Sequence, residues 1–114
     1  MIVVADDDEA MRLLCRVNLE LEGFRVLEAR NEAEIEAYVR DQRVVLLLLD
    51  VHLGTENGIE IARALRTRHP EVPVAFLTGS VHIGEQTAAV SDGAIRKPFT
   101  LEELIGTVHR LARS

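Results

Sequence analysis

The sequence predicts an α/β fold in which one parallel sheet of five strands is covered by helices on both faces, a doubly wound arrangement. Short apolar segments alternate along the chain with longer segments whose apolar residues recur every three or four positions. This is the pattern of strands alternating with helices. The segment Val44–Leu49 consists of six consecutive apolar residues and is followed by Asp50, which is typical of a strand buried on both faces of a parallel sheet.

Five strands are expected. The second contains more polar residues than the others, so it should lie at an edge of the sheet. The fifth is very short and precedes Lys97-Pro98. The expected strands cover residues 2–5, 24–29, 44–49, 73–77 and 94–96.

Helices are expected between the strands, each with a start or stop signal. The first lies between an N-cap at Asp8 and a stop at Gly23, and its apolar residues recur at helical intervals: Met11, Leu14, Val17 and Leu21. The pairs Asn31–Glu34 and Thr100–Glu103 have the spacing of capping boxes. The third helix, residues 59–69, should end before Pro70. Residues 80–91 show no clear period.

The strands should adopt the flavodoxin-like order 2-1-3-4-5. The first and third strands are the most apolar, so they should be central, and right-handed crossovers would place helices on both faces. The switch point of this order lies between strands 1 and 3. The chain has 114 residues and contains no linker or internal repeat, so residues 1–114 are expected to form one domain.

The composition argues against several classes of protein. The net charge of −6 argues against a nucleic-acid-binding surface. The longest apolar run is too short to cross a membrane, and residues 1–5 lack the features of a signal peptide. The single cysteine, Cys15, cannot form an internal disulfide, which favours a cytoplasmic location. We interpret Cys15 as a small buried residue of a helix, not as a reactive thiol.

Polar residues follow four of the five strands: Asp6 and Asp7, Asp50, Thr78, and Lys97. Because the carboxyl ends of parallel strands meet at one edge of a sheet, these side chains should be neighbours. Three converging carboxylates would repel one another. Mg²⁺, which binds a few carboxylates and keeps several waters, would relieve this repulsion. With a lysine and a hydroxyl, the set contains the groups needed for phosphoryl transfer to a carboxylate.

Four segments of the sequence carry a resemblance to a known family. They are VVADDDEAMRLL, VLLLLDVHLGTENGIEIARAL, VAFLTGS and IRKPFTLEEL. With these segments in family order over nearly the whole chain, the sequence resembles the receiver domain of bacterial two-component response regulators. The resemblance implies a Mg²⁺-dependent phosphoprotein switch. Such a domain catalyses its own phosphorylation and dephosphorylation but is not an enzyme of metabolism.

The resemblance also implies a role for each polar strand end. Asp50 is similar to the phospho-acceptor, which forms an aspartyl phosphate. Asp6 and Asp7 resemble the acids that bind Mg²⁺, or Mn²⁺ in its place, together with Asp50 and the backbone carbonyl of His52. The side chain of His52 is interpreted as a loop residue and not as a ligand.

Two further residues have roles implied by the resemblance. Thr78 resembles the switch hydroxyl that turns toward the phosphoryl group. Lys97 resembles the lysine that pairs with a phosphoryl oxygen. The family also implies a cis peptide bond at Lys97-Pro98, which is an uncommon conformation.

The sequence departs from the family pattern at two residues and in the length of one segment. Gly54 stands where most receivers have proline, and a more flexible loop is expected there. Ala94 stands where most receivers have an aromatic residue whose rotamer changes with that of the threonine. The segment from Thr78 to Lys97 is shorter than usual by about one helical turn, so the fourth helix should be short.

The implied phosphoryl donor is a phosphohistidine of a sensor histidine kinase or of a histidine phosphotransfer protein. The implied target is an output domain or a separate protein. Three alternatives stay open: a pseudo-receiver that never takes phosphate and acts as an interaction module, an interaction domain regulated through homodimerisation, and a haloacid-dehalogenase-type phosphohydrolase. The last also uses a strand-end aspartate and Mg²⁺, but its chemistry needs an acid where this chain has His52.

Overall fold

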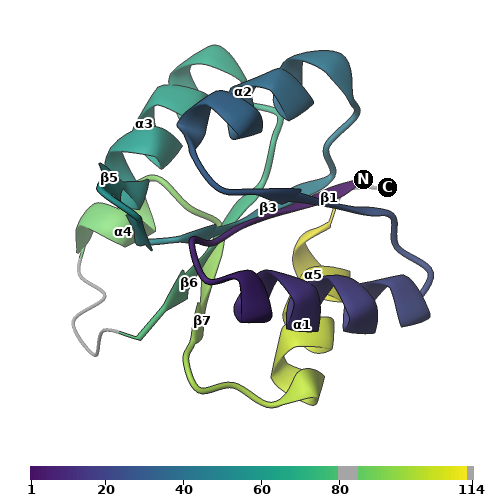
Figure 1. Cartoon of the computed structure of the whole chain (residues 1–114). Helices are drawn as coiled ribbons and strands as arrows, with labels where there is room; N and C mark the ends of the chain where they lie inside the picture. The colour runs from purple at the N-terminus through teal and green to yellow at the C-terminus, as the bar shows by residue number, and fades with distance from the viewer. Residues whose placement is uncertain (80–84, 113–114) are drawn as a thin grey trace.

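The protein is described by a computed structural model that covers residues 1–79 and 85–112. Its main sheet has five parallel strands in the order β2-β1-β3-β6-β7 (Figure 1). In chain order this is the predicted order 2-1-3-4-5, so the fold prediction is confirmed. The strands are β1 (Ile2–Ala5), β2 (Val26–Ala29), β3 (Leu46–Asp50), β6 (Val74–Thr78) and β7 (Gly93–Arg96).

Helices cover both faces of this sheet, with α1 and α5 on one face and α2 and α3 on the other (Figure 1). Their bounds are α1 (Glu9–Leu21), α2 (Glu32–Asp41), α3 (Gly58–Arg68), α4 (Glu85–Ala89) and α5 (Leu101–Leu111). Helix α4 has five residues, in keeping with the short fourth helix expected, while residues 80–84 lie outside the described part of the chain. Among the residues that the structure describes, no helix is both long and apolar enough to cross a membrane.

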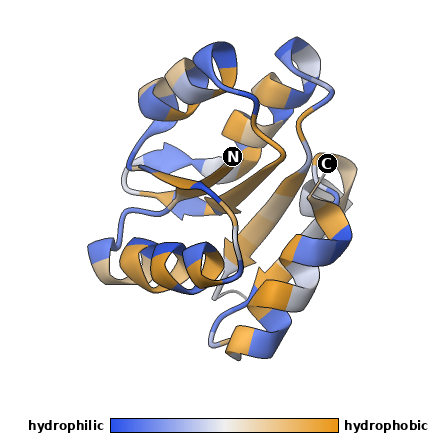
Figure 2. Ribbon diagram, turned by 90° about the vertical axis from the view of Figure 1, so that its right-hand side faces the viewer, coloured by the Kyte–Doolittle hydropathy of each residue, from blue (hydrophilic) through white to orange (hydrophobic). Residues whose placement is uncertain are grey.

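The sheet is buried on both faces because alternate residues of each central strand enter different cores. In β3, Leu46 and Leu48 pack in the core beneath α1 and α5, whereas Leu47 and Leu49 pack beneath α2 and α3. All four side chains are fully buried. Figure 2 shows the apolar strands enclosed between the helices. The apolar run ends at Asp50, so the first polar side chain of β3 lies at the carboxyl edge of the sheet.

Helix α1 forms where predicted, with Asp8 as its N-cap, but the apolar residues whose spacing predicts the helix are not its buried face. Residues Arg12, Cys15 and Leu19 are buried, so the interpretation of Cys15 is confirmed. The helix carries two apolar stripes, and the stripe that faces the sheet includes an arginine whose head group bonds to the main chain. Three of the four residues on the predicted stripe are exposed: Leu14, Val17 and Leu21.

The boundaries of several elements differ from the predictions by one or two residues. Strand β2 begins at Val26, not at residue 24.

At the start of α2, Asn31 accepts a hydrogen bond from the amide of Glu34 at 2.9 Å, as in a capping box. The carboxylate of Glu34, however, accepts from the amide of Arg30 at 2.7 Å, so the capping is displaced by one residue. Thr100 caps α5 through the amide of Glu103 at 3.1 Å.

Candidate functional site

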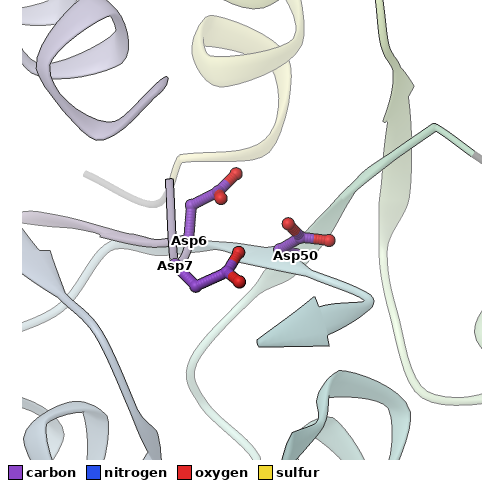
Figure 3. Close-up of side chains that lie close together, drawn as sticks. All are labelled: Asp6, Asp7 and Asp50. Carbon is purple, nitrogen blue, oxygen red and sulfur yellow. The ribbon is translucent and has the colours of Figure 1, made fainter. Parts of the chain in front are cut away.

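Three carboxylates meet at the carboxyl edge of the sheet, where β1 and β3 lie side by side. The register pairs Ala5 with Leu49, so the residues that follow β1 lie beside the end of β3. Asp6 and Asp7 leave the end of β1, and Asp50 is the last residue of β3 (Figure 3). One oxygen from each of these acids lies within 4.8 Å of the others. The structure therefore brings together the three acids that the sequence singled out.

Lys97 is the cation that faces these acids. Its Nζ lies 2.7 Å from Oδ2 of Asp6 and 3.2 Å from Oδ2 of Asp50. The side chain of Asp6 is 1% exposed and that of Asp50 is 13% exposed. The contacts of a single lysine with two largely buried carboxylates explain how the fold accommodates like charges at this edge.

The electrostatics of Asp6 reflect two opposing influences. Burial raises the pKa of Asp6, and the charge of Asp50 adds to this effect. The hydrogen bond from Lys97 and the amide of Asp8, which donates to Oδ1 of Asp6 at 2.9 Å, act in the opposite direction. Burial acts to lower the pKa of Lys97, but its bond to Asp6 and the charges of both acids raise it. Lys97 is therefore a firmly protonated cation within an acidic site.

Lys97 reaches the acids because the main chain directs it there. It follows directly after β7 and precedes Pro98, and the peptide bond between them is cis, as expected. The amide of Lys97 donates to the carbonyl oxygen of Thr78 at 2.7 Å. Thr78 is the last residue of β6 and is 2% exposed. In the pairing of β3 with β6, Leu77 is the partner of Asp50. Thr78 therefore lies one residue beyond that pair, at the same edge of the sheet.

The loop after Asp50 contains a small hairpin that the sequence analysis did not predict. Its strands are β4 (His52–Leu53) and β5 (Glu56–Asn57). The amide of His52 donates to Oδ1 of Asp50 at 3.0 Å. The side chain of His52 is exposed, as its interpretation as a loop residue predicts. Gly54 has a φ of +64°, which proline cannot adopt. Glycine adopts this φ readily, so the backbone of this loop suits Gly54 and would not accept the proline that most receivers have there.

Arg12 is a residue of the site that the sequence analysis missed. It is 8% exposed, and its guanidinium donates to the backbone carbonyl of Asp6 at 2.7 Å. Its Nε also pairs with Oε1 of Glu28 on β2 at 3.0 Å. Arg12 thereby fixes the turn that carries Asp6. The spacing of Arg12 with Cys15 and Leu19 on one helical stripe is the signal that could have placed it on the buried face.

The donor set fits a hard divalent cation. Carboxylate oxygens are the ligands that Mg²⁺ prefers, and it needs only a few of them because it keeps bound water. Asp6 and Asp50 supply shielded carboxylates, and Asp7 is exposed, which leaves one side of the cluster open to water. The cluster and Lys97 together could hold a cation and an anionic group next to each other.

Comparisons with known proteins agree with this arrangement. The family model for the response regulator receiver domain matches residues 2–109. The chain is 34% identical over 115 residues to response regulator MprA of Mycobacterium ulcerans, with 98% of this chain and 50% of that protein covered. The chain thus spans about half the length of the curated relatives it matches.

Solved structures of other proteins resemble this chain over nearly its full length. The receiver domain of NtrX from Brucella abortus has a TM-score of 0.89 at 27% identity, with 97% of each chain covered. The response regulator TrrA from Thermotoga maritima, solved in complex with Mg²⁺-BeF, has a TM-score of 0.88 at 26% identity, with 96% of each chain covered. With its parallel sheet and its acids and lysine at one edge, the chain belongs to the response regulator receiver domain family of two-component systems.

Proposed function

We propose that residues 1–114 act as a phosphorylatable receiver unit in which Asp50 accepts a phosphoryl group from a phosphohistidine. The donor would be a sensor histidine kinase or a histidine phosphotransfer protein. One observation carries the proposal: the carboxylate of Asp50 lies within 4.8 Å of two further acids and 3.2 Å from Nζ of Lys97. This is a nucleophile set among the groups that phosphoryl transfer requires.

The reaction exchanges one bond to phosphorus for another. An oxygen of the Asp50 carboxylate forms a bond to phosphorus while the bond from phosphorus to the histidine nitrogen breaks, and the electron pair of that bond stays on the imidazole. A carboxylate is a weak nucleophile, so positioning and charge neutralisation must supply the rate. The hydrogen bond from the amide of His52 to Oδ1 of Asp50 orients the carboxylate. Lys97 provides a positive charge for the phosphoryl oxygens.

Asp6, Asp7 and Asp50 would hold Mg²⁺, with the backbone carbonyl of His52 as a further ligand and Mn²⁺ as an alternative ion. When bound, the ion neutralises charge that develops on the transferring group. The acids fit this task because their oxygens converge on one place. Asp6 is held there by Arg12 and by the amide of Asp8.

Phosphorylation would switch the domain by adding about two negative charges at neutral pH. Lys97 would then share its positive charge with the new phosphoryl oxygens, and Thr78 at the adjacent strand end would supply a hydroxyl. Receiver domains are signalling switches and not metabolic enzymes. The switch would act on an output domain or on a separate protein.

Acetyl phosphate tests the proposal directly. With Mg²⁺ present, the wild-type protein should gain one phosphoryl group, detected as a mass increase and as retarded migration in a Phos-tag gel. Asp50→Asn should gain none. Asp41→Asn, which removes an exposed acid from the end of α2, should behave like the wild type. If the wild type stays unmodified, or if Asp50→Asn is modified, the proposal is wrong. An unmodified wild type would favour the pseudo-receiver alternative.

A further inference from the structure

Gly58 lies in direct contact with the main chain of the acceptor residue. It is the first residue of α3 and is buried. A methyl group added at Gly58 would lie 2.2 Å from the carbonyl oxygen of Asp50, and 2.9 Å from both Cα and the carbonyl oxygen of Val51. These atoms belong to the backbone and cannot rotate away as a side chain could. No residue other than glycine fits here without moving α3 or the end of β3.

Among the described glycines, a close contact with backbone atoms is found at Gly58. Methyl groups added at Gly79 or at Gly106, within α5, would meet nothing within 4 Å, and one added at Gly93 would meet the rotatable side chain of Leu111 at 2.9 Å. The start of α3 is also bonded to the same backbone, because the amide of Gly58 donates to the carbonyl oxygen of Val51 at 2.7 Å. The absence of a side chain lets this hydrogen bond form while the helix rests on the end of β3.

The position of the Asp50 carboxylate depends on that backbone. Oδ1 accepts from the amide of His52 at 3.0 Å, and Oδ2 lies 3.2 Å from Nζ of Lys97. An ordinary van der Waals contact to an added methyl group would be 3.4–4 Å, not 2.2 Å. Relieving the overlap therefore moves the start of α3 away from the end of β3 by more than about 1 Å, a displacement that can cost a factor of about 100 in the rate of a positioned reaction.

We propose that Gly58 is a positioning residue for Asp50: its missing side chain allows α3 to seat directly on the acceptor's backbone and so sets where the carboxylate meets its partners. This inference rests on the proposed function of Asp50 as acceptor. Gly58 itself touches no reacting atom, so its effect is exerted through the main chain of Asp50 and Val51.

Gly58→Ala tests the inference against two control variants. Gly106→Ala adds the same methyl group to an open helical site. Leu65→Ala removes a buried side chain of α3 and so loosens the helix without adding an atom beside Asp50. The maximal rate of phosphorylation by acetyl phosphate and the dissociation constant for Mg²⁺ are measured at a temperature where circular dichroism shows each variant folded. A loss of stability alone changes neither quantity for the folded protein.

We expect Gly58→Ala to be phosphorylated at least about 10-fold more slowly than the wild type and to bind Mg²⁺ several-fold more weakly. Both controls should stay within about twofold of the wild type. Equal rates and equal Mg²⁺ affinities in Gly58→Ala and the wild type would overturn the inference. So would a Leu65→Ala variant with the same defects as Gly58→Ala, because loosening α3 would then be the cause.

Two further outcomes are also decisive. If the wild type takes no phosphoryl group, the proposed function fails, and the Mg²⁺ affinities alone decide whether Gly58 positions Asp50. If Gly58→Ala is unfolded in buffer, the measurements are repeated in the osmolyte TMAO, which favours compact states. A variant that stays unfolded there would contradict a positioning role, because Gly58 would then be required for the fold and not for the site.

Discussion

Replacing Asp7 by asparagine should stabilise the protein in EDTA and remove most of the stabilisation that Mg²⁺ provides. Asparagine keeps the shape of the side chain and removes its negative charge. Without a metal ion, that charge is repelled by Asp6 and Asp50, whose oxygens lie within 4.8 Å. With Mg²⁺ bound as proposed, the same carboxylate would be a ligand of the ion. The two conditions therefore give effects of opposite sign.

The size of the repulsion follows from the geometry. Two unit charges separated by 4.8 Å, the upper limit for these oxygens, repel by about 0.9 kcal/mol at the dielectric constant of water. Asp7 is exposed, so this value applies to its pairs with Asp6 and Asp50, and not the larger value of a protein interior. Attraction to Lys97 offsets part of the sum. The free energy of unfolding in EDTA should therefore rise by about 1 kcal/mol in Asp7→Asn.

Urea unfolding followed by circular dichroism measures both effects. At a Mg²⁺ concentration about 100 times the dissociation constant, the wild type should gain about 2.7 kcal/mol. If the affinity of Asp7→Asn is about 100-fold lower, its gain at the same concentration is about 0.4 kcal/mol. Glu9→Gln removes an exposed acid from the first turn of α1 and should keep the full gain. Equal Mg²⁺ stabilisation of Asp7→Asn and wild type would refute a ligand role for Asp7, and a less stable Asp7→Asn in EDTA would refute the repulsion.

Three other variants or measurements probe the lysine, the core and the thiol. Lys97→Met, which removes the ammonium beside Asp6 and Asp50, should slow phosphorylation by acetyl phosphate about 100-fold or more; a rate within threefold of the wild type would contradict this role. Leu48→Ala empties a fully buried position of the central strand and should lower the free energy of unfolding by about 2–5 kcal/mol, measured in urea. Burial and the charge of Asp6 raise the pKa of Cys15 to about 11, so a disulfide reagent at pH 8 should react slowly with the native protein and rapidly with the unfolded one. Because the unfolded thiol loses its proton first, the stability linked to Cys15 is present below about pH 9 and is lost as the pH rises through 11, by about 2.7 kcal/mol in total; a flat profile would count against this burial.

The strand order was predictable because burial leaves a simple record in the sequence. A strand with helices on both faces must be apolar at every position, as Leu46–Leu49 is. The first polar residue after such a run lies at the end of the strand. This explains why Asp6 and Asp50 could be placed together from their positions after β1 and β3, although they are far apart in the chain.

Other features depend on contacts that no local pattern records. The strands of the β4–β5 hairpin have two residues each, too few for any period to appear. Apolarity alone does not identify the buried face of α1, because Arg12 is buried through its bonds to Asp6 and Glu28. The tight contact of Gly58 exists only once α3 is folded against β3.

The departure at Ala94 limits how a signal can leave the site. Ala94 is exposed and lines an open groove of about 430 Å³ between β7 and α5, together with Arg96, Gly106 and Arg110. Alanine has no side-chain rotamers, so a change of rotamer at this position cannot relay the state of Thr78. The link that the structure does contain runs through Lys97, whose amide bonds to the carbonyl oxygen of Thr78 at 2.7 Å and whose ammonium contacts Asp50. If Asp50 is phosphorylated as proposed, the change of charge would reach β7 through Lys97, which directly follows that strand.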